Sequence, residues 1–322
     1  MGNVHISGLH HVTAIAGDPQ KNVDFYAGVL GLRLVKRTIN FDAPDVYHLY
    51  YGDETGSPGS IMTFFPYGSD IRQGRHGLGQ TATTTFSIPQ NSIDYWIKRL
   101  DHFQVSHKEP QERMEEVVIY LEDPDGLGIE LVANSFDTRP PFSYGHIPLE
   151  FAIRGFFNVE LWEPSYELTE ALLVNQLGYT FLSESGSRRR YASEDPVAGQ
   201  FVDIVWDAQK QRGAGGKGTV HHIAFNTQSD ETQLELREKL LSAGYSPTQV
   251  LDRQYFHSIY FREPGGVLFE VATTGPGFLY DEDRKKLGEG LKLPPWEENR
   301  RKFIEDLLAP ITLHPENYAS PY

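Results

Sequence analysis

The chain has 322 residues and a formal net charge of −15, from 29 Lys and Arg against 44 Asp and Glu. A hydrophobic fraction of 39% with 12% aromatic residues provides a full core and excludes global disorder, while the acidic balance argues against nucleic acid or an anionic membrane as the main partner. Cysteine is absent, which excludes disulfides, thiolate nucleophiles, zinc knuckles and iron–sulfur clusters and leaves 12 histidines as the soft ligands for a transition metal.

Targeting and membrane-spanning segments are not visible in the sequence. The first residues lack the basic and apolar regions of a signal peptide, and no apolar run approaches the roughly 20 residues that span a bilayer. We therefore expect a cytoplasmic protein without a membrane partner.

A repeated layout organises most of the chain. Four stretches each begin with an apolar run of high β-propensity, at residues 8–15, 81–88, 155–162 and 219–226. Each run is followed by apolar residues at helical spacing, after Asp18-Pro19, Ser92, Ser165 and Ser229-Asp230 in turn. Several further strands complete each stretch, so every unit is predicted to be β-α-β-β-β.

The ends of the units support the same alignment. Residues 122–130 and 262–270 both combine an acidic residue, a proline and a glycine-containing turn with an apolar strand that carries a carboxylate. The fourth residue after the turn glycine (59, 126, 199 and 266) is Thr63, Glu130, Asp203 or Glu270 in units one to four. These positions are predicted to be structurally equivalent.

The fold class that follows is α+β, with four βαβββ modules forming two domains. We predict two modules in residues 1–134, a proline-bearing linker at 135–152, two modules in 153–273, and a charged C-terminal tail at 274–322. Within the tail, residues 297–308 have a helical pattern and are expected to pack on the body.

Two histidine doublets stand out because both lie on the first strand of a unit. His10-His11 belongs to unit one and His221-His222 to unit four, at matching points of the repeat. A single doublet on a strand is more often a packing feature than a ligand pair. Side-chain alternation predicts that the two members of each doublet point to opposite faces, so one of each pair can reach a shared cavity.

A carboxylate completes a candidate metal site. If the first and last strands of unit four lie close together, His222 and Glu270 meet at one cavity, and His11 joins them if unit one packs with unit four. Packing of unit three with unit four would instead bring only one histidine to the site. We predict the first pairing, because two histidines and one carboxylate with open positions form the facial triad of non-haem Fe(II) oxygenases. Zinc, manganese, cobalt and nickel also bind such a set.

The other two units lack this combination. Residues 82–84 and 156–158, at the positions of the doublets, contain no histidine, so Glu130 and Asp203 are carboxylates without imidazole partners. We therefore expect one metal site and a degenerate counterpart.

At the level of whole segments, the chain resembles the vicinal oxygen chelate superfamily, which includes glyoxalase I, fosfomycin-resistance proteins and type I extradiol dioxygenases. It is most similar to ring-cleaving dioxygenases that open para-hydroquinones. The resemblance covers nearly the full length and is carried by residues 9–13, 35–38, 47–50, 154–156, 221–225, 260–270, 281–283 and 287–288.

This resemblance implies Fe(II), with Mn(II) as the alternative, bound at the positions of His11, His222 and Glu270. It implies a mono- or dihydroxylated aromatic substrate with O2 on the same metal, and substrate-contacting or supporting groups at His10, Thr13, His221, Arg253 and Tyr260. In that setting His10 or His221 is the candidate general acid, Tyr260 a hydrogen-bond donor, and Arg253 the group that neutralises a phenolate.

Two other functions remain open from the sequence. One is a metal-dependent isomerase or lyase of glyoxalase I type. Thr63 disfavours it, because Thr63 takes the fourth position that faces the shared cavity, beside the two histidines and the carboxylate, and threonine is a poor metal ligand. The other is a metal-free resistance protein that sequesters aromatic compounds. The sequence leaves the oligomeric state open, a homo-oligomer included, since members of the superfamily that the chain resembles often associate.

Overall fold

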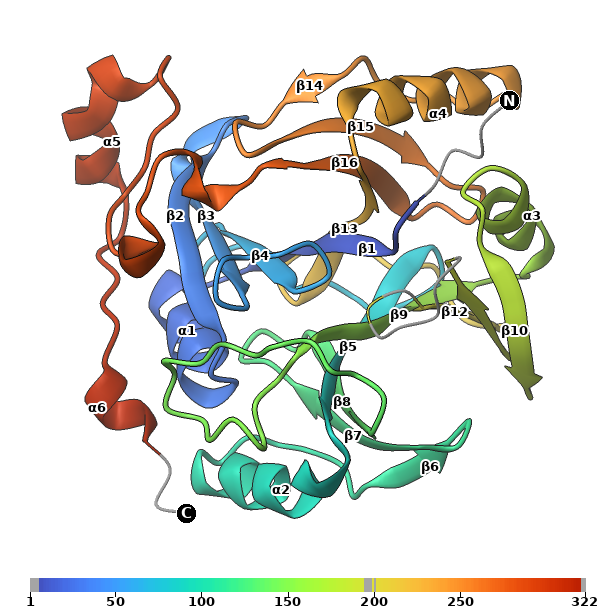
Figure 1. The fold of residues 1–322 in the computed structure, drawn as a ribbon, viewed down its shortest axis with the longest axis horizontal. Coiled ribbons are helices and arrows are strands. Elements are labelled where there is room, and N and C mark those ends of the chain that lie inside the picture. Colours follow the sequence, from blue (N-terminus) through green and yellow to red (C-terminus); the bar gives the residue numbers. More distant parts are fainter. Residues whose placement is uncertain (1–5, 194–198, 200, 320–322) are drawn as a thin grey trace.

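The computed structural model describes residues 6–193, 199 and 201–319, and its core consists of two eight-stranded sheets. The helices of the repeated units lie on the outside of the sheets, and the C-terminal tail runs along one side of the molecule (Figure 1). The observed class is α+β, as predicted.

All four predicted units are present, each with the order β-α-β-β-β. The bounds of their elements, and of those in the tail, are as follows: β1 Leu9–Ala16, α1 Pro19–Val23 continued by a π-helix at Asp24–Val29, β2 Arg33–Asn40, β3 Ala43–Gly52 and β4 Ile61–Pro66; β5 Gln80–Pro89, a 3₁₀ turn at Gln90–Ser92, α2 Ile93–His102, β6 Gln111–Arg113, β7 Glu116–Glu122 and β8 Gly128–Asn134; β9 Gly155–Glu163, α3 Glu167–Asn175, β10 Thr180–Ser185, β11 Arg188–Ala192 and β12 Phe201–Trp206; β13 Thr219–Thr227, α4 Asp230–Ser242, β14 Leu251–Asp252, β15 Phe256–Arg262 and β16 Leu268–Pro276; and in the tail, 3₁₀ turns at Phe278–Tyr280, Arg284–Lys286 and Glu298–Arg300, α5 Arg301–Leu307 and α6 Pro315–Tyr318.

The sheets join units that are not all consecutive in the chain. One sheet has the order β14-β15-β16-β13-β1-β4-β3-β2 and so combines units four and one, which confirms the predicted pairing. The other has the order β10-β11-β12-β9-β5-β8-β7-β6 and combines units three and two. Within each unit the first and last strands are parallel neighbours, as β13 and β16 are. Residues 1–134 and 153–273 thus each contribute one unit to each sheet, and their division into domains stays a prediction.

Two helices begin with side-chain caps at the residues that the sequence indicates, whereas Ser92 makes no side-chain cap bond at α2 and the N-cap of α3 is Tyr166. The Asp18 side chain accepts hydrogen bonds from the backbone of the first turn of α1, and Ser229 forms a capping box with Thr232 at the start of α4. Buried leucines such as Leu236 and Leu240 then attach α4 to its sheet. In unit one the expected single helix is an α-helical turn followed by a π-helix, whose bond from Leu30 N to Phe25 O spans five residues.

The C-terminal tail covers the β2 edge of the first sheet. The helical pattern predicted for 297–308 is confirmed by a 3₁₀ turn followed by α5, and Ile304 packs with Ile39 in a small apolar cluster. Nearer the sheet, the fully buried Lys36 donates to Asp281 and Glu282 of the tail. Such a buried charge is tolerated because it is paired.

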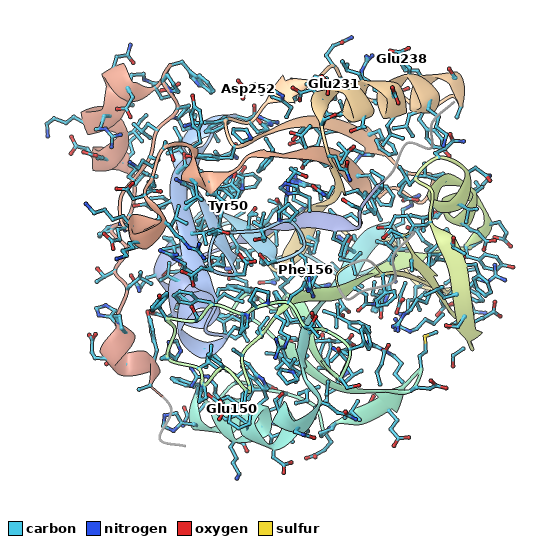
Figure 2. The ribbon with its side chains drawn as sticks, in the orientation of Figure 1. Tyr50, Glu150, Phe156, Glu231, Glu238 and Asp252 are labelled. Carbon is cyan, nitrogen blue, oxygen red and sulfur yellow. The ribbon has the colours of Figure 1, made fainter. Side chains whose placement is uncertain are left out.

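The distribution of side chains follows ordinary burial rules. Tyr50 and Phe156 lie inside, whereas Glu150, Glu231 and Glu238 stand at the periphery (Figure 2). Among the described residues, no helix has the length and the hydropathy needed to cross a bilayer.

A buried pair of acidic residues predicts a pH-dependent stability. Glu163, at the end of β9, is fully buried, and neither carboxylate oxygen has a donor among the described residues. Burial and then the adjacent Glu263 raise the pKa of Glu163 to about 9. The folded state therefore holds a proton that the unfolded chain releases near pH 4.3, and the free energy of unfolding should fall between about pH 5 and 9, by up to about 1.4 kcal/mol per pH unit.

Glu163→Gln, which mimics the protonated acid, is expected to remove this decline. Urea unfolding at pH 5, 7 and 9 measures it: the two proteins should be similar at pH 5, and the variant should be the more stable at pH 9. A parallel decline in both proteins would contradict the prediction.

Candidate metal centre

Three adjacent strands at the centre of the first sheet bring the candidate ligands together. His11 lies on β1, His222 on β13 and Glu270 on β16, and these strands are neighbours in the sheet. Their exposed fractions are 2%, 5% and 0%. The predicted triad is therefore assembled inside the protein from segments more than 200 residues apart in the chain.

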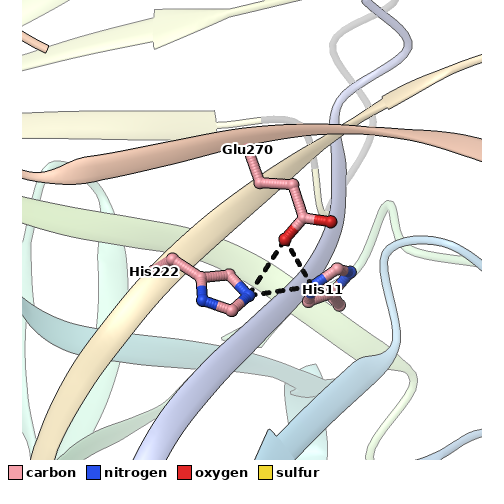
Figure 3. Close-up of side chains that lie close together, drawn as sticks. All are labelled: His11, His222 and Glu270. Carbon is pink, nitrogen blue, oxygen red and sulfur yellow. Dashed lines mark hydrogen bonds and ion pairs between the residues drawn. The ribbon is translucent and has the colours of Figure 1, made fainter. Parts of the chain in front are cut away.

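The three side chains converge through one atom each (Figure 3). The Nε2 atoms of His11 and His222 are 3.2 Å apart, and Glu270 Oε2 lies 3.1 Å from the first and 3.0 Å from the second. The other carboxylate oxygen of Glu270 accepts a hydrogen bond from Ser258. Burial alone would raise the pKa of Glu270, but His11 and His222 outweigh it and hold that pKa well below its usual value.

This donor set fits a divalent transition ion. Ligand atoms bound at about 2.0–2.2 Å and at right angles around an ion would lie about 2.8–3.1 Å from one another, close to the observed separations. Glu270 Oε2 is buried and has no hydrogen-bond donor, other than the two imidazole rings, among the described residues. A carboxylate oxygen in this situation is best satisfied by a cation.

In each doublet, the histidine that is not a candidate ligand contacts the one that is, contrary to strict alternation. His10 Nδ1 lies 2.9 Å from His11 Nδ1, and His221 Nδ1 lies 2.8 Å from His222 Nδ1. The expectation that the two rings point to opposite faces is therefore wrong. The pairing of β1 with β13 is irregular at both doublets. At the first doublet, Leu9 and His11 pair with consecutive residues of β13, so the residue between them has no partner. Such a β-bulge redirects the side chains.

The supporting histidines are held neutral. Burial, with the neighbouring His11, lowers the pKa of His10 to about 3, and burial, with the neighbouring His222, lowers that of His221 to about 4. A neutral ring can accept a hydrogen bond from the Nδ1–H of a ligating histidine, which leaves the ligand's Nε2 free for a metal. His10 and His221 thus have the geometry of groups that orient the ligands.

A cavity of about 310 Å³ opens onto the triad, at the lower end of the size range of small-molecule sites. Arg253 and Tyr260 line it and are bonded to each other, with Arg253 Nε 3.2 Å from the Tyr260 hydroxyl. Asp42, on the turn between β2 and β3, lies 3.4 Å from Arg253 at the exposed side. Most of the remaining wall is aromatic: Phe41, Tyr50, Phe65, Tyr67 and Phe256.

The structure places the predicted site residues in two groups. His11, His221, His222, Arg253 and Tyr260 line the cavity. The remaining three do not line it: Glu270 is the third candidate ligand, His10 lies against His11, and Thr13 bonds its hydroxyl to that of Thr63 at 2.8 Å.

One polar residue of the cavity had been given no role in the sequence. His48, on β3, lines the wall and bonds to Thr63 and Tyr50. The available signal was spacing, because His48 and Tyr50 are two residues apart on a strand and so share a face.

The second sheet holds the degenerate counterpart of the site. By strand register, His11, His222 and Glu270 correspond to Thr83, Asn158 and Asp203. Arginines fill the space instead: Arg113 bonds to Glu130, and Arg188 and Arg190 bond to Asp203. In the part of the chain that the structure describes, the triad is the one group of three side chains arranged to hold a metal.

Comparisons of sequence identify relatives over almost the whole chain. The model of the Glyoxalase/Bleomycin resistance protein/Dioxygenase superfamily matches residues 8–131 and 170–271. A Bacillus subtilis (strain 168) protein with the provisional name of ring-cleaving dioxygenase MhqO is 44% identical over 304 residues, which cover 94% of this chain and 96% of the relative. The chlorohydroquinone/hydroquinone 1,2-dioxygenase of Sphingobium indicum is 35% identical over 317 residues, covering 96% and 98%.

A comparison of folds agrees. The crystal structure of a Bacillus subtilis protein provisionally described as a dioxygenase superposes with a TM-score of 0.92 at 42% identity, covering 96% of this chain and 99% of that one.

Proposed function

The chain belongs to the glyoxalase/bleomycin resistance protein/dioxygenase superfamily, and from this premise we propose that it is an Fe(II)-dependent dioxygenase that cleaves the ring of hydroquinone-type aromatics. The observation that carries the proposal is the buried cluster of His11, His222 and Glu270 opening onto a small aromatic-lined cavity. Mn(II) is the alternative ion.

His11, His222 and Glu270 would hold the ion with one ligand atom each. When bound, Fe(II) would supply Lewis-acid and redox chemistry for the reaction of a phenol with O2. His10 and His221 fix the ring orientation of His11 and His222 through the Nδ1 contacts, which keeps each Nε2 aimed at the ion. The protein thereby sets the geometry in which the two reactants meet.

The rest of the cavity is suited to bind a hydroxylated ring. Aromatic faces of Phe65 and Phe256 provide apolar walls, and Tyr260 offers a hydroxyl donor. Burial, together with the negative charge of Glu270, raises the pKa of Tyr260, so this hydroxyl keeps its proton at neutral pH. Arg253 supplies a positive charge that attracts an anionic oxygen of the substrate despite the acidic net charge of the chain.

An isomerase of glyoxalase I type is less well supported. A fourth protein ligand would come from the position of Thr63, but its hydroxyl is bonded to Thr13 and His48. A metal-free binding protein would not explain why a carboxylate oxygen is buried with two imidazole nitrogens as its partners.

The proposal is tested by loading the metal-free protein anaerobically with Fe(II), Mn(II) or Zn(II) and recording O2 uptake with hydroquinone, chlorohydroquinone and catechol. We expect uptake with Fe(II) or Mn(II) and a hydroquinone, and none with Zn(II). Turnover of the hemithioacetal of glutathione and methylglyoxal, without O2 uptake on any phenol, would instead establish the isomerase.

Arg253→Gln is expected to raise the KM for hydroquinone about tenfold or more, because a hydrogen bond to a charged group contributes about 1.5–3 kcal/mol. The kcat should change little, since Arg253 is not a metal ligand. Arg253→Lys should recover part of the affinity. Asp42→Asn serves as the matched control, because the Asp42 side chain is 77% exposed and its contact with Arg253 is an ion pair of 3.4 Å at the mouth of the cavity. A similar rise in KM for Asp42→Asn would contradict a direct role of Arg253.

A further inference from the structure

A chain of four hydrogen-bonding side chains leads from the interior of the first sheet toward the triad. Tyr50 Oη lies 2.7 Å from His48 Nδ1, His48 Nε2 lies 2.8 Å from Thr63 Oγ1, and Thr63 Oγ1 lies 2.8 Å from Thr13 Oγ1. Strand register produces this chain, because Thr63 on β4 is paired with Tyr50 on β3 and with Thr13 on β1.

The last member of the chain stands beside the metal ligands. Thr13 is two residues after His11 on the same strand, and His222 is its partner on β13. Thr13 and Thr63 are fully buried. Thr13 is therefore a neighbour of both histidine ligands within the sheet, and its hydroxyl is shielded from bulk water.

The direction of the hydrogen bonds is set at the Tyr50 end. Tyr50 is 2% exposed, its ring packs on Phe278 and Tyr255 at centroid distances of 5.0 and 6.4 Å, and among the described residues its hydroxyl has His48 as its one acceptor. If His48 donated to Tyr50, the phenolic proton would have no protein acceptor among the described residues, which is costly for a residue that is 2% exposed. The favourable arrangement has Tyr50 donating to His48 Nδ1.

The remaining donors then follow one another. A neutral imidazole that accepts at Nδ1 carries its proton at Nε2 and donates to Thr63, which in turn donates to Thr13. Burial, with the neighbouring His11 and His222, holds the pKa of His48 well below its ordinary value, consistent with the neutral ring that this arrangement needs. The Thr13 hydroxyl proton is then not used within this series of hydrogen bonds, and it remains available to a group at the triad.

We propose that Tyr50, His48 and Thr63 are positioning residues that fix the Thr13 hydroxyl as a hydrogen-bond donor to an oxygen atom bound at the triad. The inference rests on the proposed function in one respect, because that oxygen would belong to the aromatic substrate or to O2. In this role the three residues act through Thr13, and His48 and Tyr50 also line the cavity.

The tautomer of His48 provides a test that needs neither metal nor turnover. Long-range ¹H–¹⁵N spectra of the metal-free protein, labelled in histidine and assigned with His48→Gln, should show a neutral ring protonated at Nε2. In Tyr50→Phe, which removes only the phenolic hydroxyl, the preference for this tautomer should weaken. A ring protonated at Nδ1 in the wild type, or one unchanged by Tyr50→Phe, would overturn the proposal.

Steady-state kinetics test the consequence for the reaction. Tyr50→Phe is expected to lower kcat about tenfold with little change in KM, since one net hydrogen bond is lost in orienting the donor. Thr63→Val should have at least the same effect, Thr63→Ser should restore most of the rate, and Tyr50→Phe should add little to Thr63→Val because both break one chain.

The neighbouring residue supplies the matched control. Tyr51 is also buried and donates its hydroxyl to Asn22 at 2.9 Å, on the side away from the triad. Tyr51→Phe should leave kcat within about twofold while removing a comparable hydrogen bond. Equal losses of kcat in Tyr50→Phe and Tyr51→Phe would overturn the proposal. A wild type that takes up no O2 would refute the proposed function. The His48 spectra would then still test the series of hydrogen bonds from Tyr50 to Thr13.

Discussion

Replacing Glu270 with alanine is expected to abolish metal binding and ring cleavage together. Glu270 supplies the one negative charge of the triad, and its Oε2 is 3.1 and 3.0 Å from the Nε2 atoms of His11 and His222. Without it, two neutral imidazoles remain in a buried cavity, and they do not compensate the free energy that a divalent ion loses on dehydration. Loss of groups that merely support a ligand weakens metal binding about 10–100-fold, so loss of the ligand itself should cost at least about 100-fold.

Metal content after gel filtration, and the rise of the thermal midpoint on adding Mn(II), would measure this effect. Mn(II) should raise the midpoint of the wild type, because a ligand that binds only the folded state stabilises it, and should leave Glu270→Ala unchanged. Glu130→Gln is the matched control, since Glu130 has the corresponding place in the sequence repeat but is bonded to Arg113 in the second sheet. Wild-type metal content in Glu270→Ala would remove the site from consideration.

Replacing Arg190 with methionine is expected to lower the free energy of unfolding by about 3 kcal/mol, measured in urea. Arg190 is 5% exposed and binds Asp203 through two bonds of 2.8 and 2.9 Å, and it also binds Glu116. Removal of one partner from a buried ion pair leaves an uncompensated charge and costs about 3–5 kcal/mol. The lower figure applies because Arg188 also bonds to Asp203.

The adjacent Arg189 tests whether burial is the reason. Its partners include Glu184, whose side chain is 42% exposed, and Arg189→Met should therefore cost less than about 1 kcal/mol. Similar losses in the two variants would show that the arginine cluster of the second sheet is no more important to stability than surface ion pairs. The expected difference would support the view that this cluster stabilises the sheet in place of a metal.

The repeat, the grouping of His11, His222 and Glu270 and the pairing of units could be predicted from the sequence, because they depend on periodicity and on residue type. Strand and helix periodicities mark the four modules, and chemistry selects the first with the fourth, since only that pairing joins His11 to His222 and Glu270. The sheet order confirms this selection. Residue types alone therefore predicted an arrangement of strands that are far apart in the chain.

The orientation of the doublets was not accessible, because a β-bulge is a property of two strands together. Alternation within β1 separates His10 from His11, but the extra residue in its pairing with β13 brings their rings into contact. The same limit applies to His48 and Thr63, whose bond depends on the register of β3 and β4. The arginines that fill the second sheet lie on β6 and β11, and no motif in the sequence connects them with Asp203 and Glu130.

The most direct test of the central claim is the fate of O2 when the Fe(II)-loaded protein meets hydroquinone. With ¹⁸O2, the account predicts one O2 consumed per ring opened, and a product whose mass equals that of the substrate plus both labelled oxygen atoms. The same experiment with His11→Ala should give neither uptake nor product. An Fe(II)-loaded wild type that leaves both hydroquinone and O2 unchanged, or a His11→Ala variant that matches its rate, would contradict the account.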